Sequence, residues 1–330
     1  MSRRDWPPEE WTERRRPILI VGSPRSGTTW VEEVLGSTHG AYTIHEPDNE
    51  TSNPFAVRAK SGLGRFPVLA AGDEAPEELV ELWDRAFAGC IHSGSVRWLA
   101  AKALLKTAGT DLTAAFDRTE SRLSPRLRLV KGLAGPPSFR QDDPQVIVKS
   151  VHAPLAVEWI AYRWRPRVIV VRRNPFSIVA SHMELGWQDA RLDTHPFLQR
   201  RLAALAAVPP LSPGESRLSR LAWQIGLFTT ALEAAASRNP HWHVVSHEEL
   251  CRRPEAGFRS LSEELGLTWT ESASAFLAES NRPGQGLVTQ RLAAEESERW
   301  RRRLTAEQID EVAGVLSRFP ATACTDGATA

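Results

Sequence analysis

The sequence predicts an α/β protein with three layers, α/β/α, built on a parallel sheet of about four or five strands. Three observations lead to this fold class. Short apolar runs rich in β-branched residues recur along the chain, helical patterns separate them, and no internal repeat or low-complexity segment interrupts them. Strands that alternate with helices pair in parallel through right-handed crossovers, so we expect helices on both faces of one sheet.

The composition limits the function classes that the chain can serve. Its 330 residues, 42% of them hydrophobic, are enough for a large core, and its net charge of +1 provides no bulk attraction to nucleic acid or membrane surfaces. Three cysteines far apart predict neither a disulfide framework nor a zinc site. No apolar run is long enough to cross a bilayer, and no secretory signal is recognisable. We therefore expect a cytoplasmic protein without an integral membrane segment or a nucleic-acid partner.

The first half of the chain opens with a charged arm, residues 1–16, which we expect to be flexible. Residues 17–21, PILIV, predict a strand buried on both faces, and residues 22–27 predict a turn of small residues. From Thr28 onwards, apolar residues at helical spacing predict a short helix. A second short strand is expected within 41–50.

Residues 51–144 form a large, mostly helical insertion in which no motif is recognisable. Helical patterns are predicted at 76–89, 95–107 and 111–120, whereas the Pro, Gly and Ser content of 121–144 predicts mostly loop. Insertions of this kind in α/β enzymes commonly cover the ligand crevice, so we expect this one to shape the substrate site.

The remaining segments complete the alternation. Strands are predicted at 145–149, 167–172 and 241–245, and helices at 154–164, 175–185, 195–207, 215–237 and 254–265. A last helix begins near Thr305, a predicted N-cap with Gln308 three residues on. We expect a single domain over residues 1–330, ending in a flexible tail at 320–330.

The stretch GSPRSGTTW, residues 22–30, predicts an anion-binding site. A buried strand, a Gly/Ser turn and a helix start direct backbone N–H groups and the positive end of the helix dipole to one point. The spacing G-x-x-x-x-G matches a Walker A loop and predicts a P-loop-type sheet, but Thr28 occupies the lysine position. The strand RVIVVRRN also ends without a magnesium-binding Asp. A P-loop kinase of a small metabolite is therefore the weaker alternative.

Two motifs resemble those of sulfotransferases that use 3′-phosphoadenosine 5′-phosphosulfate (PAPS). The stretch PRSGTTW resembles the 5′-phosphosulfate loop of that family, and VVRRNPFSIVAS resembles its second motif, with Arg173 and Ser181 eight residues apart. The resemblance implies that the second motif binds the 3′-phosphate, with Arg173 as a fork-shaped donor. The loop residues implied in donor binding are Pro24, Arg25, Ser26, Gly27, Thr28, Thr29 and Trp30.

The resemblance offers two candidates for the general base. Glu46 follows Arg25 by 21 residues, as in the tyrosylprotein and bacterial carbohydrate or lipid branch, and it could take the acceptor proton. The cytosolic branch uses the His of Lys-Thr-His, but here His152 comes one residue late, which reverses its face in an extended segment. We favour Glu46 and keep His152 as the alternative. Lys149 matches the family lysine that stabilises the leaving phosphate.

The resemblance also sets the expected reaction. A late loop of this family closes over the nucleotide, and Arg282 and Arg291 in residues 281–292 are the candidates for that role here. The implied reaction is in-line transfer of a sulfuryl group from PAPS to a hydroxyl or amine, with adenosine 3′,5′-bisphosphate (PAP) as product and no metal ion. The acceptor is a small molecule, a glycan or a lipid.

Overall fold

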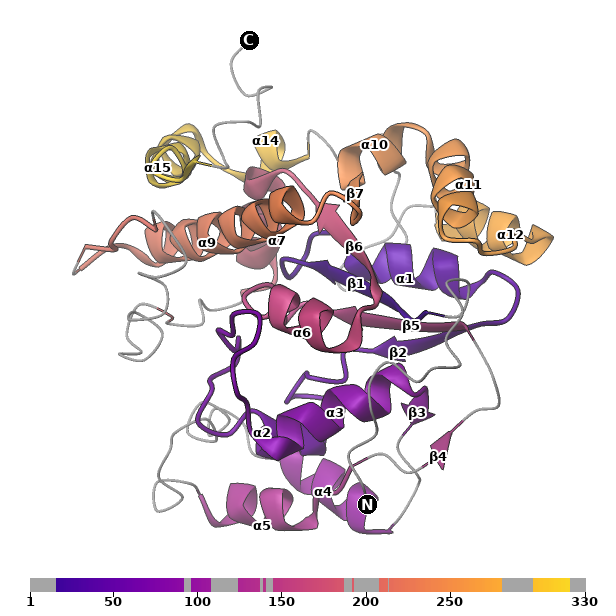
Figure 1. Ribbon diagram of the computed structural model, residues 1–330. Coiled ribbons are helices and arrows are strands. Elements are labelled where there is room, and N and C mark those ends of the chain that lie inside the picture. The colour runs from indigo at the N-terminus through magenta and orange to yellow at the C-terminus, as the bar shows by residue number, and fades with distance from the viewer. Residues whose placement is uncertain are drawn as a thin grey trace. The chain divides into compact units, whose positions relative to one another are not determined.

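The structure is a computed structural model (Figure 1) that describes nine parts of the chain. These are residues 16–91, 96–107, 124–136, 139–140, 145–186, 192, 208–212, 214–280 and 299–320. The helices predicted at 111–120 and 195–207, the candidate Arg291, most of the arm and the tail lie outside them. The chain packs as two compact units: Met1–Ile20 with Gly40–Val168, and Val21–His39 with Ile169–Ala330.

The main sheet has five strands in the order β2-β5-β1-β6-β7, which agrees with the predicted number. The strands are β1 (Ile18–Gly22), β2 (Ala41–His45), β5 (Gln145–Ser150), β6 (Arg167–Arg172) and β7 (His243–Ser246). β2 pairs with β5 and β6 with β7, both in parallel as expected. All five residues of β1 are buried, which confirms the prediction of a strand covered on both faces. β1 and β6 each begin in the first unit and end in the second.

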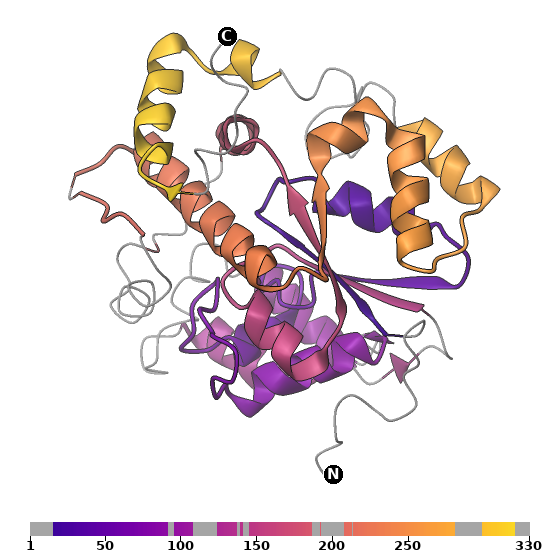
Figure 2. The same ribbon diagram turned by 45° about the horizontal axis from the view of Figure 1, so that its top comes forward.

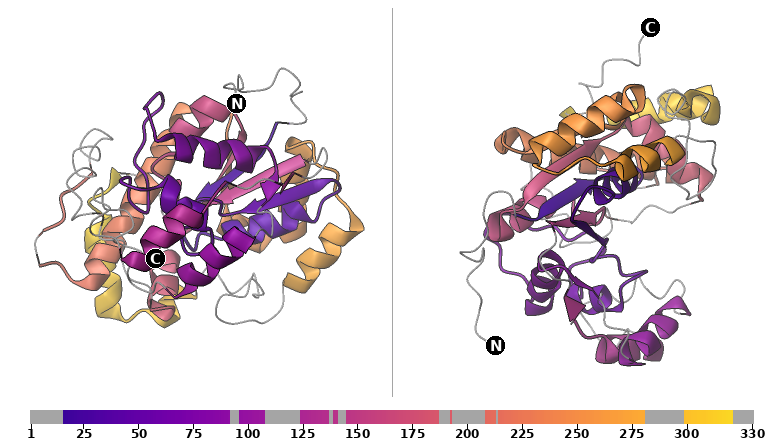
Figure 3. Two further views of the ribbon diagram at one scale, coloured as in Figure 1. Left: turned by 90° about the horizontal axis from the view of Figure 1, so that it is seen from below. Right: turned by 90° about the vertical axis from the view of Figure 1, so that its right-hand side faces the viewer.

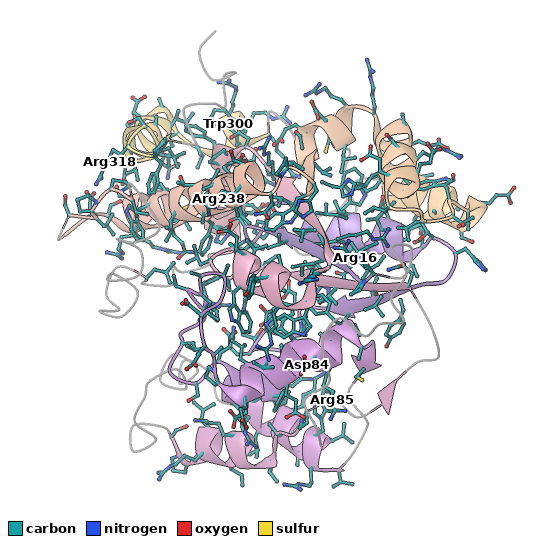
Figure 4. The ribbon with its side chains drawn as sticks, viewed as in Figure 1. Arg16, Asp84, Arg85, Arg238, Trp300 and Arg318 are labelled. Carbon is teal, nitrogen blue, oxygen red and sulfur yellow. The ribbon has the colours of Figure 1, made fainter. Side chains whose placement is uncertain are left out.

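The first unit carries five helices and a small two-stranded antiparallel sheet among its described residues (Figures 1 and 3). They are α2 (Pro54–Ala59), α3 (Glu77–Phe87), α4 (Val96–Lys106), α5 (Pro125–Leu133), α6 (Val157–Trp164), β3 (Cys90–Ile91) and β4 (Phe139–Arg140). Aromatic rings fill its core: Trp164 packs edge-on against Trp159 with ring centroids 5.1 Å apart, and Phe87 lies 5.9 Å from Trp164. The indole of Trp164 donates a 2.8 Å hydrogen bond to Asp84 of α3, which Figure 4 labels.

Helix α5 corrects the prediction that residues 121–144 are mostly loop. Ser124 caps this helix by accepting a hydrogen bond from the backbone N–H of Leu127, and Pro125 occupies the first helical turn, where its missing N–H costs nothing. Leu127 and Val130 are buried together with Val57 and Leu105. Ser and Pro were therefore helix-start signals here, although their abundance alone suggested a loop.

The second unit is dominated by helices among its described residues (Figure 2). They are α1 (Thr28–Gly36), α7 (Pro175–Glu184), α9 (Arg217–Arg238), α10 (His247–Arg252), α11 (Pro254–Glu264), α12 (Glu271–Ser280), α14 (Trp300–Arg303) and α15 (Ala306–Leu316). α9 and α15 lie side by side, and the capping box of Thr305 and Gln308 starts α15 as predicted. Trp300, labelled in Figure 4, stacks on Phe176 of α7 at 4.7 Å. No described helix combines the length and hydrophobicity that a bilayer span requires.

Candidate active site

The loop between β1 and α1 takes a shape that requires glycine at two positions. A Cβ on Gly22 would lie 2.3 Å from Oγ of Ser26, so a side chain at this position would displace the turn. Gly27 has φ of 94°, in the left-handed region that glycine adopts without strain. The backbone N–H of Ser26 donates to the carbonyl of Ser23 at 3.0 Å, which closes the turn just before α1 begins. The local sequence therefore builds the predicted strand, turn and helix start.

Polar groups of this loop are suited to an anion. The hydroxyls of Ser23 and Ser26 are buried and have no hydrogen-bond partner in the described parts of the chain. A buried hydroxyl without a partner is costly unless a ligand satisfies it. The N-terminus of α1 adds first-turn backbone N–H groups and a positive dipole end at the same place. These residues fit a phosphate or sulfate group.

The second motif contacts the loop directly. Nε of Arg25 donates a 3.0 Å hydrogen bond to Oγ of Ser181, and an Nη of Arg173 donates to the carbonyl oxygen of Arg25 at 2.8 Å. Arg25 itself has φ of 71°, an unusual conformation for a residue with a side chain. Asn174 caps α7 by accepting from the backbone N–H of Phe176 at 2.9 Å, and this fixes the helix that carries Ser181. Two sequence-predicted motifs are thus brought together within the second unit.

His247 is a residue of this region that sequence reasoning missed. A Cβ added to Gly27 would lie 2.2 Å from Cδ2 of His247, so the imidazole packs directly against the loop. Burial, and then the charge of Arg173, hold the pKa of His247 well below its usual range, so the ring is neutral at pH 7. Ser246 caps α10 and accepts from the backbone N–H of Glu249. The available signal was S-H-E-E, a helix start after a strand.

Trp30 lies in the interior of the second unit. Its indole N–H donates to Oγ of Ser280 at 3.0 Å, and its ring meets Phe258 and His247 edge-on at 4.9 and 5.8 Å. These contacts connect α1 to α10, α11 and α12. The predicted role of Trp30 in donor binding stays a prediction.

In the first unit, Glu46 and Lys149 form an ion pair at adjacent strand ends. The register of β2 and β5 sets this pairing: His45 lies opposite Lys149, and the backbone N–H of Glu46 donates to the carbonyl of Lys149 at 2.8 Å. Burial acts to raise the pKa of Glu46, but Lys149 and a hydrogen bond from Asn49 outweigh it and lower this pKa from 4.5 to about 2. Glu46 is therefore a carboxylate held by an ammonium group.

His152 lies in a buried cluster of charged side chains. Its Nδ1 is 3.0 Å from a carboxylate oxygen of Glu50 and 3.0 Å from Nζ of Lys60. Nζ of Lys60 lies 2.7 Å from the same Glu50 oxygen, and Nε of Arg65 lies 2.9 Å from the other. Burial opposes ionisation of Glu50, yet Lys60, His152 and Arg65 hold its pKa well below the usual range.

The sequence signal for this cluster was weak. Glu50 and Lys60 were not predicted as site residues, although EPDNE carries three acidic residues at alternate positions and Lys60 is one of five lysines in an arginine-rich chain. Among the described side chains, no group of three or more His, Cys, Asp or Glu is placed to hold a metal ion. The donor-loop residues, Arg173 and Ser181 belong to the second unit, and Glu46, Lys149 and His152 to the first.

These features define an α/β protein with a loop suited to an anion between its first strand and first helix. The family model described as the sulfotransferase family matches residues 17–271. The chain therefore belongs to the sulfotransferase family. Among curated proteins, none matches the chain significantly in sequence.

The solved structures to which this chain is similar are distant from it. The sulfotransferase domain from the curacin biosynthetic pathway has a TM-score of 0.44 and 15% identity, covering 92% of this chain and 98% of that one. The sulfotransferase domain from the Synechococcus PCC 7002 olefin synthase has a TM-score of 0.42 and 12% identity, covering 94% and 97%. Mouse sulfotransferase SULT7A1, complexed with PAP, has a TM-score of 0.37 and 12% identity, covering 95% and 88%.

Proposed function

We propose that this protein transfers a sulfuryl group from PAPS to a hydroxyl or amine of a small-molecule, glycan or lipid acceptor. The observation that carries the proposal is the contact between the two motifs: Arg173 and Ser181, eight residues apart on one strand–helix unit, both hydrogen-bond to Arg25 of the loop. An anion loop alone is generic. Its coupling to a second basic motif supports a donor with phosphates at two positions.

The donor is held by the second unit in this proposal. The backbone N–H groups of the loop, with the unpartnered hydroxyls of Ser23 and Ser26, receive the 5′-phosphosulfate. Arg173 and Ser181 receive the 3′-phosphate, and Arg25 exchanges its hydrogen bond to Ser181 for one to the donor. The other predicted loop residues, Pro24, Gly27, Thr28, Thr29 and Trp30, shape this site, and Arg291 is the candidate from the late segment.

Lys149 and Glu46 divide the chemistry between them. An acceptor oxygen attacks sulfur, the new O–S bond forms as the bond from sulfur to the bridging phosphate oxygen breaks, and PAP leaves. Negative charge grows on that bridging oxygen, and the ammonium of Lys149 stabilises it. As Lys149 turns to the leaving group, Glu46 loses the partner that lowers its pKa and becomes basic enough to take the acceptor proton.

The buried contacts of His152 favour Glu46 as the base. His152 already pairs with Glu50, which it shares with Lys60. Taking one partner out of such a buried ion pair leaves the other charge uncompensated, which is costly. No metal takes part in the proposed reaction. We place the enzyme in a bacterium, because its Glu base is the one expected in the bacterial carbohydrate or lipid sulfotransferase branch. We place it in the cytoplasm, since the buried free thiols of Cys90 and Cys251 are compatible with a reducing compartment.

Thermal denaturation with PAP tests the proposed donor. We expect PAP to raise the melting temperature of the wild-type protein, whereas MgATP does not, and Arg173→Ala to abolish most of the rise. Glu46→Ala keeps the PAP effect but loses turnover of labelled PAPS, and His152→Ala retains turnover in proportion to its folded fraction. Absence of any PAP effect on the wild type would contradict the proposed donor. An active Glu46→Ala variant beside an inactive, folded His152→Ala variant would move the base to His152.

A further inference from the structure

Alternate residues of the segment after β2 contact the last two residues of β5 and His152 just beyond it. Glu46 meets Lys149, Asp48 meets Ser150, and Glu50 meets His152. None of these three contacts follows from the family motifs. Residues 46–49 form a turn, closed by the backbone N–H of Asn49, which donates to the carbonyl oxygen of Glu46 at 3.0 Å. From this turn the three carboxylates make three successive contacts, here called rungs.

The middle rung joins Asp48 to Ser150, both fully buried. The hydroxyl of Ser150 lies 2.9 and 2.7 Å from the two carboxylate oxygens of Asp48, to which it donates. The same hydroxyl accepts hydrogen bonds from the backbone N–H groups of His152 at 3.0 Å and Ala153 at 3.1 Å. One oxygen therefore shapes the turn that follows Lys149 and ties this turn to Asp48.

The outer rung is the ion cluster around Glu50. Nζ of Lys60, with a side chain that is 0% exposed, is fixed by Glu50 and by the carbonyl oxygen of Arg65 at 2.8 Å. Lys60 is also the C-terminal cap of α2. Phe66 covers His152, with ring centroids 5.2 Å apart. The cluster thus binds the end of the 46–50 segment to His152 and to α2 in a dry environment where each charge has a partner.

The inner rung holds an unfavourable backbone conformation. Glu46 has φ of 43°, in the left-handed region, and it precedes Pro47. A residue before proline is confined to extended conformations, so the left-handed conformation here is disfavoured on two counts. Such strain persists only where the surroundings over-determine it, and it is common at functional sites. The middle and outer rungs are the contacts that impose it.

We propose that Asp48 and Glu50 are positioning residues that hold the carboxylate of Glu46 against Lys149. This inference rests on the roles proposed above for Glu46 and Lys149. Asp48 and Glu50 act through Ser150 and His152, and neither exchanges a proton with the substrate. Loss of either rung lets the 46–50 segment relax to an extended conformation and moves Glu46 away from Lys149.

The separation of Glu46 from Lys149 has a measurable electrostatic signature. The groups that face Glu46 are Lys149, Asn49 and His45, whose Nε2 lies 4.0 Å from Oε1, with the like charge of Asp48 behind them. Of these, Lys149 contributes most to lowering the pKa of Glu46. A variant that loosens the pair therefore raises this pKa, whereas general destabilisation leaves it unchanged in the folded population.

The test uses Asp48→Asn and Glu50→Gln, which keep side-chain size, in the full-length protein. The pKa of Glu46 is read by NMR of carboxyl-labelled glutamate, with Glu46→Gln assigning the signal, beside kcat with PAPS and the PAP-dependent rise in melting temperature. We expect the Glu46 pKa to rise by about 1 or more in Glu50→Gln, and by less in Asp48→Asn, where loss of the like charge of Asp48 acts in the opposite direction. In both variants we expect kcat to fall about 10- to 100-fold, because small misplacements of a reacting group are costly, and PAP binding to stay unchanged.

Asp84→Asn is the matched control. It removes a half-buried carboxylate hydrogen-bonded to Trp164 in the same unit, away from the rungs. We expect it to leave the Glu46 pKa and kcat unchanged, and because burial raises the pKa of Asp84, the loss of its charge should not destabilise the protein. Asp48→Asn combined with Ser150→Ala should be no worse than Ser150→Ala alone, because Ser150→Ala already removes the contact with Asp48. This double-mutant cycle of Asp48 and Ser150 tests the inference even if Glu50→Gln does not fold.

Two outcomes separate the inference from the proposed function. An unchanged Glu46 pKa in folded Asp48→Asn, with kcat reduced no more than in Asp84→Asn, would overturn the positioning role. A wild-type protein that transfers no sulfuryl group would refute the proposed function, while the pKa measurement would still decide whether the rungs hold Glu46 against Lys149.

Discussion

Replacing Lys149 by Met tests the electrostatic core of the proposed mechanism. Met retains most of the volume of the buried side chain but removes the ammonium that pairs with Glu46. Glu46, with a side chain 12% exposed, is then a carboxylate in a poorly solvated position without its main cation. Since burial alone raises the pKa of Glu46, we expect this pKa in the variant to lie above 4.5 instead of at about 2.

The magnitude follows from the lowered pKa. The difference between 4.5 and about 2, at about 1.4 kcal/mol per pH unit, corresponds to about 3 kcal/mol of folding free energy at pH 7. The sign is fixed by linkage: a lowered carboxyl pKa stabilises the folded protein above pH 4.5, and this stabilisation is lost as the pH falls towards 2. The stability difference between wild type and variant should therefore be largest at neutral pH and should shrink below pH 4.5.

Urea denaturation between pH 3 and pH 7 measures this difference, and carboxyl NMR measures the pKa itself. Lys131→Met is the control, because it removes an ammonium group in the same unit that donates a 2.9 Å hydrogen bond to Ser61. We expect the control to change stability by about 1 kcal/mol with little pH dependence. A Glu46 pKa that stays near 2 in Lys149→Met would refute the reasoning, because another group would then be holding the carboxylate.

Two further substitutions test the donor site. Gly27→Ala places a side chain on a residue in the left-handed region and against His247. We therefore expect the unfolding free energy to fall by about 2 kcal/mol or more, and PAP no longer to raise the melting temperature. A variant that still responds to PAP would contradict the proposed loop shape. Asn174→Ala removes the cap of α7, and we expect about 1 kcal/mol of destabilisation together with weaker PAP binding by calorimetry. Thr305→Ala removes the cap of α15 and should destabilise the protein by a similar free energy, but leave the PAP affinity unchanged. Equal losses of PAP affinity in Asn174→Ala and Thr305→Ala would mean that the cap of α7 has no specific role in PAP binding.

Much of the fold was predictable because the sheet strands are short, apolar and separated by periodic helices. All five strands of the main sheet and the helices α3, α4, α7, α9 and α11 begin and end within a few residues of the predicted positions. The failures occurred where local composition competed with tertiary burial. Helix α5 was predicted as loop from its Ser, Pro and Gly content, yet Leu127 and Val130 bury one face of it.

The candidate site was predictable where chemistry lies in contiguous motifs. The loop and the Arg173/Ser181 motif are each encoded in a dozen residues, and their mutual contacts follow from the carboxyl ends of parallel strands meeting at one sheet edge. The contacts of Asp48, Glu50 and Lys60 with Ser150 and His152 were not predictable, because they join segments about a hundred residues apart. His247 was missed for the same reason: its contact with Gly27 depends on tertiary packing.

Incubation of the purified protein with sulfur-labelled PAPS and metabolite extracts tests the central claim most directly. We expect label to move to an acceptor as PAP accumulates in equal amount. Arg173→Ala and Glu46→Ala should each suppress this transfer, and only Arg173→Ala should also lose the effect of PAP on the melting temperature. Binding of PAP without transfer to any acceptor, or transfer that persists undiminished in folded Glu46→Ala and His152→Ala alike, would contradict the mechanism proposed for this sulfotransferase.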